Sequence, residues 1–232
     1  MQLSGRNTYS GQTILENGAL SVASLNNFAH GTPRSSLGAP TDIEAGEVVI
    51  GEEGKDADCA LIYTGRGETS DRVMNLAGKN LTVTFDQSGI GLFKLTSTFL
   101  ISGYGANKTI ALKGDTAGKG EIAGNIVNPH DRAGKATTAV TKSGAGTWTL
   151  SGTNTYTGPT MVRQGTLALA NAQSLGEKTD VSISDGASLD LNFKEEMRIG
   201  KLIIDGQSQP AGNYGAANIP QRLKGKGMLR NQ

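Results

Sequence analysis

The sequence has almost no cysteine: Cys59 is the single one in 232 residues. One thiol excludes an internal disulfide and a zinc site built on several thiolates at short spacing. Histidine is nearly as scarce, since His30 and His130 are the two in the chain and each lies beside turn-forming Gly, Pro or Asn residues. We interpret both as loop histidines rather than as a metal or catalytic pair. Backbone hydrogen bonds and packing must therefore hold the fold, and no cofactor is expected.

Excess charge of one sign and long apolar runs are also missing. The 22 Lys and Arg residues balance 21 Asp and Glu residues, which leaves a net charge of +1. Such a chain has no bulk field that would attract nucleic acid or an anionic membrane. Its apolar runs, such as residues 59–63 and 202–204, are far shorter than the roughly 20 residues that span a bilayer. We expect no nucleic-acid partner and no membrane insertion by this chain.

Glycine, in contrast, is abundant. The 33 glycines make up about 14% of the chain, twice the usual share, while aromatic residues reach only 5%. Hydrophobic residues account for 36%, many of them small or β-branched. This composition argues against helices and favours short strands joined by many turns.

A segment near the start of the chain returns near its middle. Residues 3–13 (LSGRNTYSGQT) reappear as residues 150–160 (LSGTNTYTGPT), at a constant offset of 147. The match continues in the same register through residues 17–23 and 164–170. Because the first copy begins inside the repeated motif, we expect the chain to be part of a longer protein. Internal repetition of this kind is typical of stacked repeat architectures.

A third match places an insertion in the first copy. Residues 36–43 resemble those that follow Gln173, but at an offset of 138 instead of 147. The first copy therefore carries nine extra residues, which we place within residues 26–34, where Asn, Gly and Pro indicate a loop. We assign the repeat copies to residues 1–43 and 142–181.

Both copies, and the region between them, consist of short segments that alternate at period two with glycines between them. Strands of three to five residues separated by single-glycine corners suit a coil whose strands stack in parallel on the next turn. The predicted strands are residues 81–85, 91–95, 109–112, 120–124, 147–150, 160–162, 166–169, 181–183 and 189–191.

Residues 142–158 (KSGAGTWTLSGTNTYTG), followed by Gly-Thr-Leu at 165–167, closely resemble the autotransporter-associated β-strand repeat. That repeat occurs in the passenger regions of bacterial autotransporters and in very large secreted surface proteins. Residues 200–232 are similar to the usual closing segment of such modules. The resemblance implies an all-β fold, a right-handed parallel β-helix (β-solenoid), and an extracellular or cell-surface location.

We predict that residues 1–232 form a single elongated β-solenoid. Coils of roughly 20–25 residues at about 4.8 Å per step would give on the order of ten coils. The residues to which we assign the repeat motif are structural in this interpretation: Asn7, Tyr9, Gly11, Gly18, Trp148, Gly152, Asn154, Tyr156, Gly158 and Gly165.

The aromatic residues of the motif permit two interpretations. Tyr9 and Tyr156 occupy the same position in both copies. They could be stacking platforms for sugars, or corner residues that pack on the next coil and bond their hydroxyl group to a loop carbonyl. Repetition within a motif favours the structural role, and Trp148, inside a predicted strand, is interpreted in the same way.

No catalytic pattern in the sequence is complete. Adjacent residues on a strand point to opposite faces, so the acidic pairs Glu52-Glu53 and Glu195-Glu196 would not reach one substrate. Asp56 and Asp58 are interpreted as a solvated loop, because glycine, lysine and alanine surround them. Motifs for a serine nucleophile, for nucleotide binding and for calcium nonapeptides are all incomplete. The aspartates that lie beside glycine are assigned to turns, namely Asp115, Asp185 and Asp205.

The sequence therefore predicts a non-enzymatic stalk or fibre element of a bacterial surface protein. Because the first copy starts inside the repeat, head-to-tail stacking of copies into a homo-oligomer or filament is expected, although the basic C-terminal residues and Pro220 could act as a cap. The alternative is an adhesin module that binds surface glycans on the solenoid face. A polysaccharide-active enzyme is a third and weaker alternative.

Overall fold

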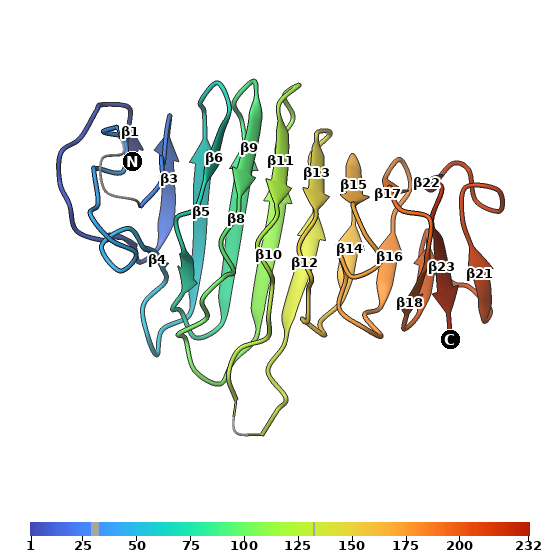
Figure 1. Cartoon of the computed structure of the whole chain (residues 1–232). Coiled ribbons are helices and arrows are strands. Elements are labelled where there is room, and N and C mark those ends of the chain that lie inside the picture. Colours follow the sequence, from blue (N-terminus) through green and yellow to red (C-terminus); the bar gives the residue numbers. More distant parts are fainter. Residues whose placement is uncertain (29–32, 132) are drawn as a thin grey trace.

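Glycine-rich turns and short strands give this chain an all-β architecture of parallel sheets (Figure 1). The computed structural model describes residues 1–28, 33–131 and 133–232, and within this part of the chain there is no helix. Accordingly, no membrane-spanning helix is found there. The chain advances from the N-terminus at one end of the stack to the C-terminus at the other (Figure 1).

The largest sheet has ten strands, and nine of them run parallel. In spatial order they are β1 (Gln2–Leu3), β3 (Gly18–Val22), β5 (Ala57–Tyr63), β8 (Leu81–Gln87), β10 (Lys108–Lys113), β12 (Thr138–Lys142), β14 (Thr160–Val162), β16 (Val181–Ile183), β19 (Leu202–Ile204) and the antiparallel β20 (Gln207–Ser208).

A second, seven-stranded sheet is parallel throughout. Its order is β6 (Glu68–Ser70), β9 (Leu92–Leu95), β11 (Lys119–Ile122), β13 (Thr147–Leu150), β15 (Thr166–Leu169), β17 (Ser188–Leu191) and β22 (Leu223–Gly225). Two three-stranded sheets complete the fold. One holds β2 (Thr13–Leu15), β4 (Val48–Ile50) and β7 (Met74–Leu76), and the other holds β18 (Glu196–Ile199), β23 (Met228–Asn231) and β21 (Gly212–Tyr214).

Coil length varies along the stack. One row of partners in the ten-stranded sheet runs through Gly18, Cys59, Val83, Ile110, Val140, Thr160, Val181 and Leu202. The steps are therefore 41, 24, 27, 30, 20, 21 and 21 residues long, from the first pair to the last. The prediction of 20–25 residues was right for four of these steps and too short for three. The 41-residue step contains the predicted insertion.

The core consists of rows of inward side chains, one from each coil. Along the row that begins at Leu20, the partners are Leu61, Phe85, Leu112, Lys142, Val162 and Ile183, all of them buried. A coil too short to have a core of its own thus buries its apolar side chains against its two neighbours.

Parallel stacking stops near the C-terminal end of the ten-stranded sheet. The strand beyond β19 is β20, which runs antiparallel to it, and β21 likewise runs antiparallel to β23. Short reversed strands therefore cover the edge at this end in two of the sheets, whereas the seven-stranded sheet ends in the parallel β22.

The predicted strands agree closely with the observed ones. β13, β14, β15 and β16 have the predicted bounds, and the other predicted strands differ by one or two residues at an end. An all-β fold with parallel sheets, compatible with a β-solenoid, is confirmed. The prediction that Asp58 lies in a loop was wrong, because this residue belongs to β5. Its side chain is exposed, as predicted.

Candidate functional site

The two repeat copies make the same hydrogen bonds. The side-chain amide of Asn7 donates to the carbonyl oxygen of Ser36 at 2.7 Å, and that of Asn154 donates to Ser174 at 2.6 Å. Leu3 pairs with Val22 as Leu150 pairs with Leu169, so the strand register within each copy is also the same.

The repeated tyrosines also form matching contacts. The hydroxyl group of Tyr9 lies 2.9 Å from Oγ1 of Thr13, and that of Tyr156 lies 2.7 Å from Oγ1 of Thr160. The expectation of a loop carbonyl as partner was wrong: in both copies the hydroxyl group bonds to the threonine four residues further along the motif. Burial distinguishes the copies, because Tyr156 is fully buried while Tyr9 is 38% exposed.

The glycine of the third matched segment is required because the backbone of the repeated tyrosine lies close to it. Gly38 lies against the carbonyl oxygen of Tyr9, and Gly176 lies in the same way against that of Tyr156, so a Cβ at either position would overlap the carbonyl. Several motif glycines also lie against the backbone of a preceding coil, namely Gly152, Gly158 and Gly165, whereas Gly11 and Gly18 have open space around them.

Trp148 belongs to an aromatic row in the core that connects the seven-stranded sheet with β5 of the ten-stranded sheet. It is buried and donates its indole N–H to the carbonyl oxygen of Lys113 at 2.7 Å. Its ring lies edge-on to Phe93 with centroids 6.3 Å apart, and Phe93 stacks on Tyr63 at 4.4 Å. Gly120 lies between Phe93 and Trp148 in the strand register and leaves the indole the room it needs.

The two copies lie on different faces of the stack. β2 and β14 correspond at the offset of 147, yet β2 belongs to a three-stranded sheet and β14 to the ten-stranded sheet. A repeat of this kind therefore encodes one coil with its corners and does not fix the face on which that coil starts.

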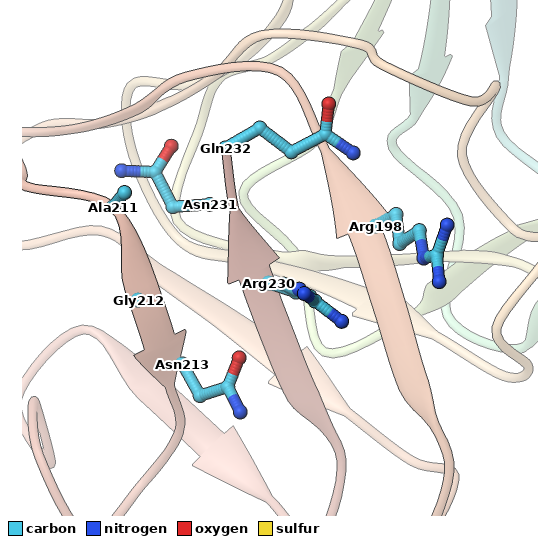
Figure 2. Close-up of a pocket in the computed structure, with 7 residues that line it drawn as sticks. All are labelled: Arg198, Ala211, Gly212, Asn213, Arg230, Asn231 and Gln232. Carbon is cyan, nitrogen blue, oxygen red and sulfur yellow. The ribbon is translucent and has the colours of Figure 1, made fainter.

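A polar hollow of about 700 Å³ lies at the C-terminal end (Figure 2). Arg198 of β18 and Arg230 of β23 are direct neighbours in the parallel register, and Asn213 of β21 is the partner of Arg230 on its other side. In Figure 2 the two arginines extend in the same direction from adjacent strands. The remaining lining residues are Ala211, Gly212, Asn231 and Gln232.

Two comparisons with known proteins agree with this geometry. A family model described as Passenger-associated-transport-repeat matches residues 1–22 and 140–169, which are the strand-forming parts of the two copies. The chain is also 35% identical over 181 residues to a protein named Adhesin BmaC autotransporter from Brucella suis biovar 1 (strain 1330).

The chain carries autotransporter passenger repeats. The resemblance seen in the sequence is confirmed, and the protein is extracellular or located at the bacterial cell surface. The match covers 78% of this chain but only 5% of the Brucella protein's length. No solved structure matches the chain.

Two buried lysines of the passenger module were not predicted. Lys142 occupies an inward position between Leu112 and Val162, and its ammonium group donates to the carbonyl oxygens of Ser143 at 2.8 Å and Gly144 at 2.7 Å. Burial lowers the pKa of Lys142 to about 8.

Lys108 is the second buried lysine. It donates to the carbonyl oxygens of Lys79 at 2.6 Å and Ala106 at 2.9 Å, and burial lowers its pKa to about 8 as well. Both ammonium groups thus bond to backbone carbonyls at the corners of coils, which is a structural role.

A third buried cation holds the base of the insertion. Arg72 is 1% exposed and donates to the carbonyl oxygen of Leu37 at 2.6 Å. Glu68, close in sequence, accepts hydrogen bonds from the backbone N–H groups of Leu25 at 2.7 Å and Asn26 at 3.0 Å. Desolvation raises the pKa of the Glu68 carboxyl group, and these two backbone hydrogen bonds act in the opposite direction.

The acidic candidates are engaged in local contacts. Glu52 pairs with Lys55 at 2.8 Å, and Asp56 accepts a hydrogen bond from the side chain of Asn80 at 3.0 Å. Glu195 accepts a hydrogen bond from the backbone N–H of Lys194 at 3.1 Å.

The aspartates assigned to turns also have partners. Asp115 accepts a hydrogen bond from the backbone N–H of Ala145 at 2.6 Å, and Asp185 and Asp205 both pair with Arg222. In the described part of the chain no cluster of three metal-ligating side chains occurs. His130 is exposed and lies edge-on to Tyr104, with ring centroids 6.2 Å apart, while His30 lies outside the described residues.

Proposed function

We propose that the chain is a non-enzymatic structural module, a stiff stalk element of an extracellular bacterial surface protein. The observation that carries this proposal is the parallel ladder, in which nine strands of one sheet follow one another along the chain. Each internal coil hydrogen-bonds to the coil before it and the coil after it, so a force along the stack is shared among many backbone hydrogen bonds.

We further propose that the coil is right-handed and that residues 1–232 act as one unit. Parallel strands joined by crossover connections are right-handed in nearly all known cases. The inward rows run from coil to coil without interruption from Leu20 to Ile183, which supports a single core.

Single-molecule pulling through the two ends of the chain tests the stalk proposal. A fully extended coil of 21 residues spans about 75 Å, so we expect the released contour length to rise in steps of about one coil or small multiples of it. The variant Gly176→Pro is compared with the unchanged chain. It should lower the force of the first step, because the substitution disturbs a corner of a coil. Extension without resolved force peaks would contradict a mechanical role for the module.

A second candidate function is glycan binding by the same module. The Brucella relative is named an adhesin, and the polar hollow around Arg198 and Arg230 offers two exposed guanidinium groups, of which that of Arg198 forms no ion pair among the described residues. We propose this as an additional role, because a stalk can carry a binding surface on one of its faces.

A further inference from the structure

Where two charged residues lie opposite each other on neighbouring strands of this chain, their charges are usually of opposite sign. In the registers of the described strands, four cross-strand pairs join two charged residues. Three of them are of opposite sign and one joins two arginines: Lys113–Asp86, Glu121–Lys94, Asp190–Lys224 and Arg198–Arg230. Like charges directly opposite each other on adjacent strands are destabilising unless something neutralises them.

The neighbourhood neutralises only part of this charge. Glu196, two residues before Arg198 on β18, lies 3.4 Å from Nη1 of Arg230. Within the described residues Arg198 forms no ion pair, so only one of the two guanidinium groups has a carboxylate partner. Both arginines have exposed side chains, which leaves their donors open to an anion from solution.

The wall of the hollow is fixed by a buried side chain. Asn231 is 4% exposed, its Oδ1 accepts the backbone N–H of Leu202 at 2.9 Å, and its Nδ2 donates to the carbonyl oxygens of Gln209 and Pro210, both at 2.7 Å. The amide of Asn213 beside Arg230 can add a neutral donor and acceptor.

A second hollow of about 410 Å³ adjoins the first at Arg198, which lines both. Its other walls include the hydroxyl and amide groups of Thr153, Thr155 and Gln173, next to the apolar side chains of Ala172 and Leu175. It also contains the carboxylates of Glu177 and Glu196, which disfavour an anion on that side. The combined groove thus favours an anionic group at one end and neutral hydroxyl-bearing groups at the other.

We propose that this groove binds an acidic oligosaccharide, with a carboxylate or sulfate group between Arg198 and Arg230 and an adjacent neutral sugar against Thr153 and Thr155. Planar guanidinium groups hydrogen-bond to such oxyanions through paired donors. The threonine hydroxyl groups and the amide of Gln173 match the hydroxyl groups of a neutral sugar. The inference deepens the glycan-binding role and is independent of the stalk role.

Titration calorimetry with three tetrasaccharides tests the inference: hyaluronan for the carboxylate, chondroitin sulfate for the sulfate, and chitotetraose as the neutral control. We expect at least one acidic tetrasaccharide to bind. Because both acidic tetrasaccharides carry glucuronate carboxylates, tighter binding of chondroitin sulfate would assign the site to the sulfate group, and equal binding of the two would assign it to the carboxylate. Arg198→Gln and Arg230→Gln should each weaken binding about tenfold, and the double variant should abolish it. Arg163→Gln, at an exposed arginine on another part of the stack, is the matched control and should bind like the unchanged chain.

Two further measurements separate binding from folding. Without ligand, the melting temperature of the double variant should equal or exceed that of the unchanged chain, because a like-charge pair has been removed. Glu177→Gln should strengthen binding, because it removes a carboxylate that faces the neutral half of the groove. Equal binding of acidic and neutral tetrasaccharides, or unchanged acidic binding by a folded double variant, would overturn the inference. Either result would leave the pulling experiment on the stalk unaffected.

Discussion

Trp148 covers Gly120 on the neighbouring strand, where a methyl group would overlap the indole ring. Gly120→Ala should therefore lower the free energy of unfolding by about 1–3 kcal/mol, as overpacked cores do. Gly11→Ala is the matched control, since no atom lies near that position, and its effect should stay within about 0.5 kcal/mol. Chemical denaturation measures both.

If overlap with the indole ring causes the destabilisation by Gly120→Ala, then a smaller side chain at position 148 should reduce that destabilisation. Trp148→Leu in the Gly120→Ala background should destabilise the chain less than Trp148→Leu alone, because the two positions are coupled. Strict additivity of the two changes would show that the close approach is not the cause.

The repeated tyrosine provides an internal comparison. Tyr156→Ala should lower the free energy of unfolding by about 3 kcal/mol, because a fully buried aromatic side chain is removed. Tyr9→Ala should cost clearly less, because that tyrosine is 38% exposed. Tyr156→Phe removes only the contact with Thr160 and should cost about 1 kcal/mol. An unchanged melting temperature for Tyr156→Ala, combined with loss of glycan binding, would support the sugar-platform interpretation instead.

The buried lysines predict a particular dependence of stability on pH. Lys142 and Lys108 release their protons near pH 8 in the folded chain and near pH 10.4 when unfolded. Between these values the unfolded chain binds more protons, so stability rises with pH by up to about 1.4 kcal/mol per unit for each lysine. Burial raises the pKa of the Cys59 thiol, which acts in the opposite direction.

Denaturation at several pH values between 8 and 9.5 measures this slope. Lys142→Met should flatten it relative to the unchanged chain, whatever the variant does to absolute stability, because the contribution of Cys59 is common to both. Equal slopes for the two proteins would contradict a depressed pKa at Lys142.

Head-to-tail association is a prediction that rests on the exposed edge of β2. Ile14 in that strand is 60% exposed, and a hollow of about 620 Å³ lined by Leu3, Leu15 and Leu20 lies beside it. We expect light scattering to detect a rise in mass with concentration, and Ile14→Lys to suppress it by placing a charge on the edge. A monomer at all concentrations would indicate that the antiparallel β20 and β21 prevent stacking.

Much of the fold could be predicted because each strand carries its own signal. Residues 147–150 and 166–169 alternate at period two and each begin directly after a glycine, so their bounds follow from the local pattern. The face on which a copy lies could not be predicted, because it depends on the lengths of all the coils in between. β2 and β14 have matching sequences and belong to different sheets.

The functional candidates were harder to predict for a related reason. Lys142 follows Val140 at period two, which was a signal for an inward side chain, but its charge suggested exposure. Arg198 and Arg230 are 32 residues apart, and nothing in the sequence indicates that their strands are neighbours. A pairing between coils becomes visible only when the register of the stack is known.

Deletion of one complete coil tests the central claim most directly. In the absence of residues 160–180, Val181 can take the place of Thr160 beside Val140, and Leu189 can take the place of Leu167 beside Trp148. We predict that this shorter chain keeps its β-type circular dichroism spectrum and a cooperative thermal transition, because stacked coils contribute nearly independently. The matched control lacks only residues 160–169, about half a coil, and should lose that transition. An unfolded chain after the whole-coil deletion, or equal tolerance of both deletions, would contradict the account.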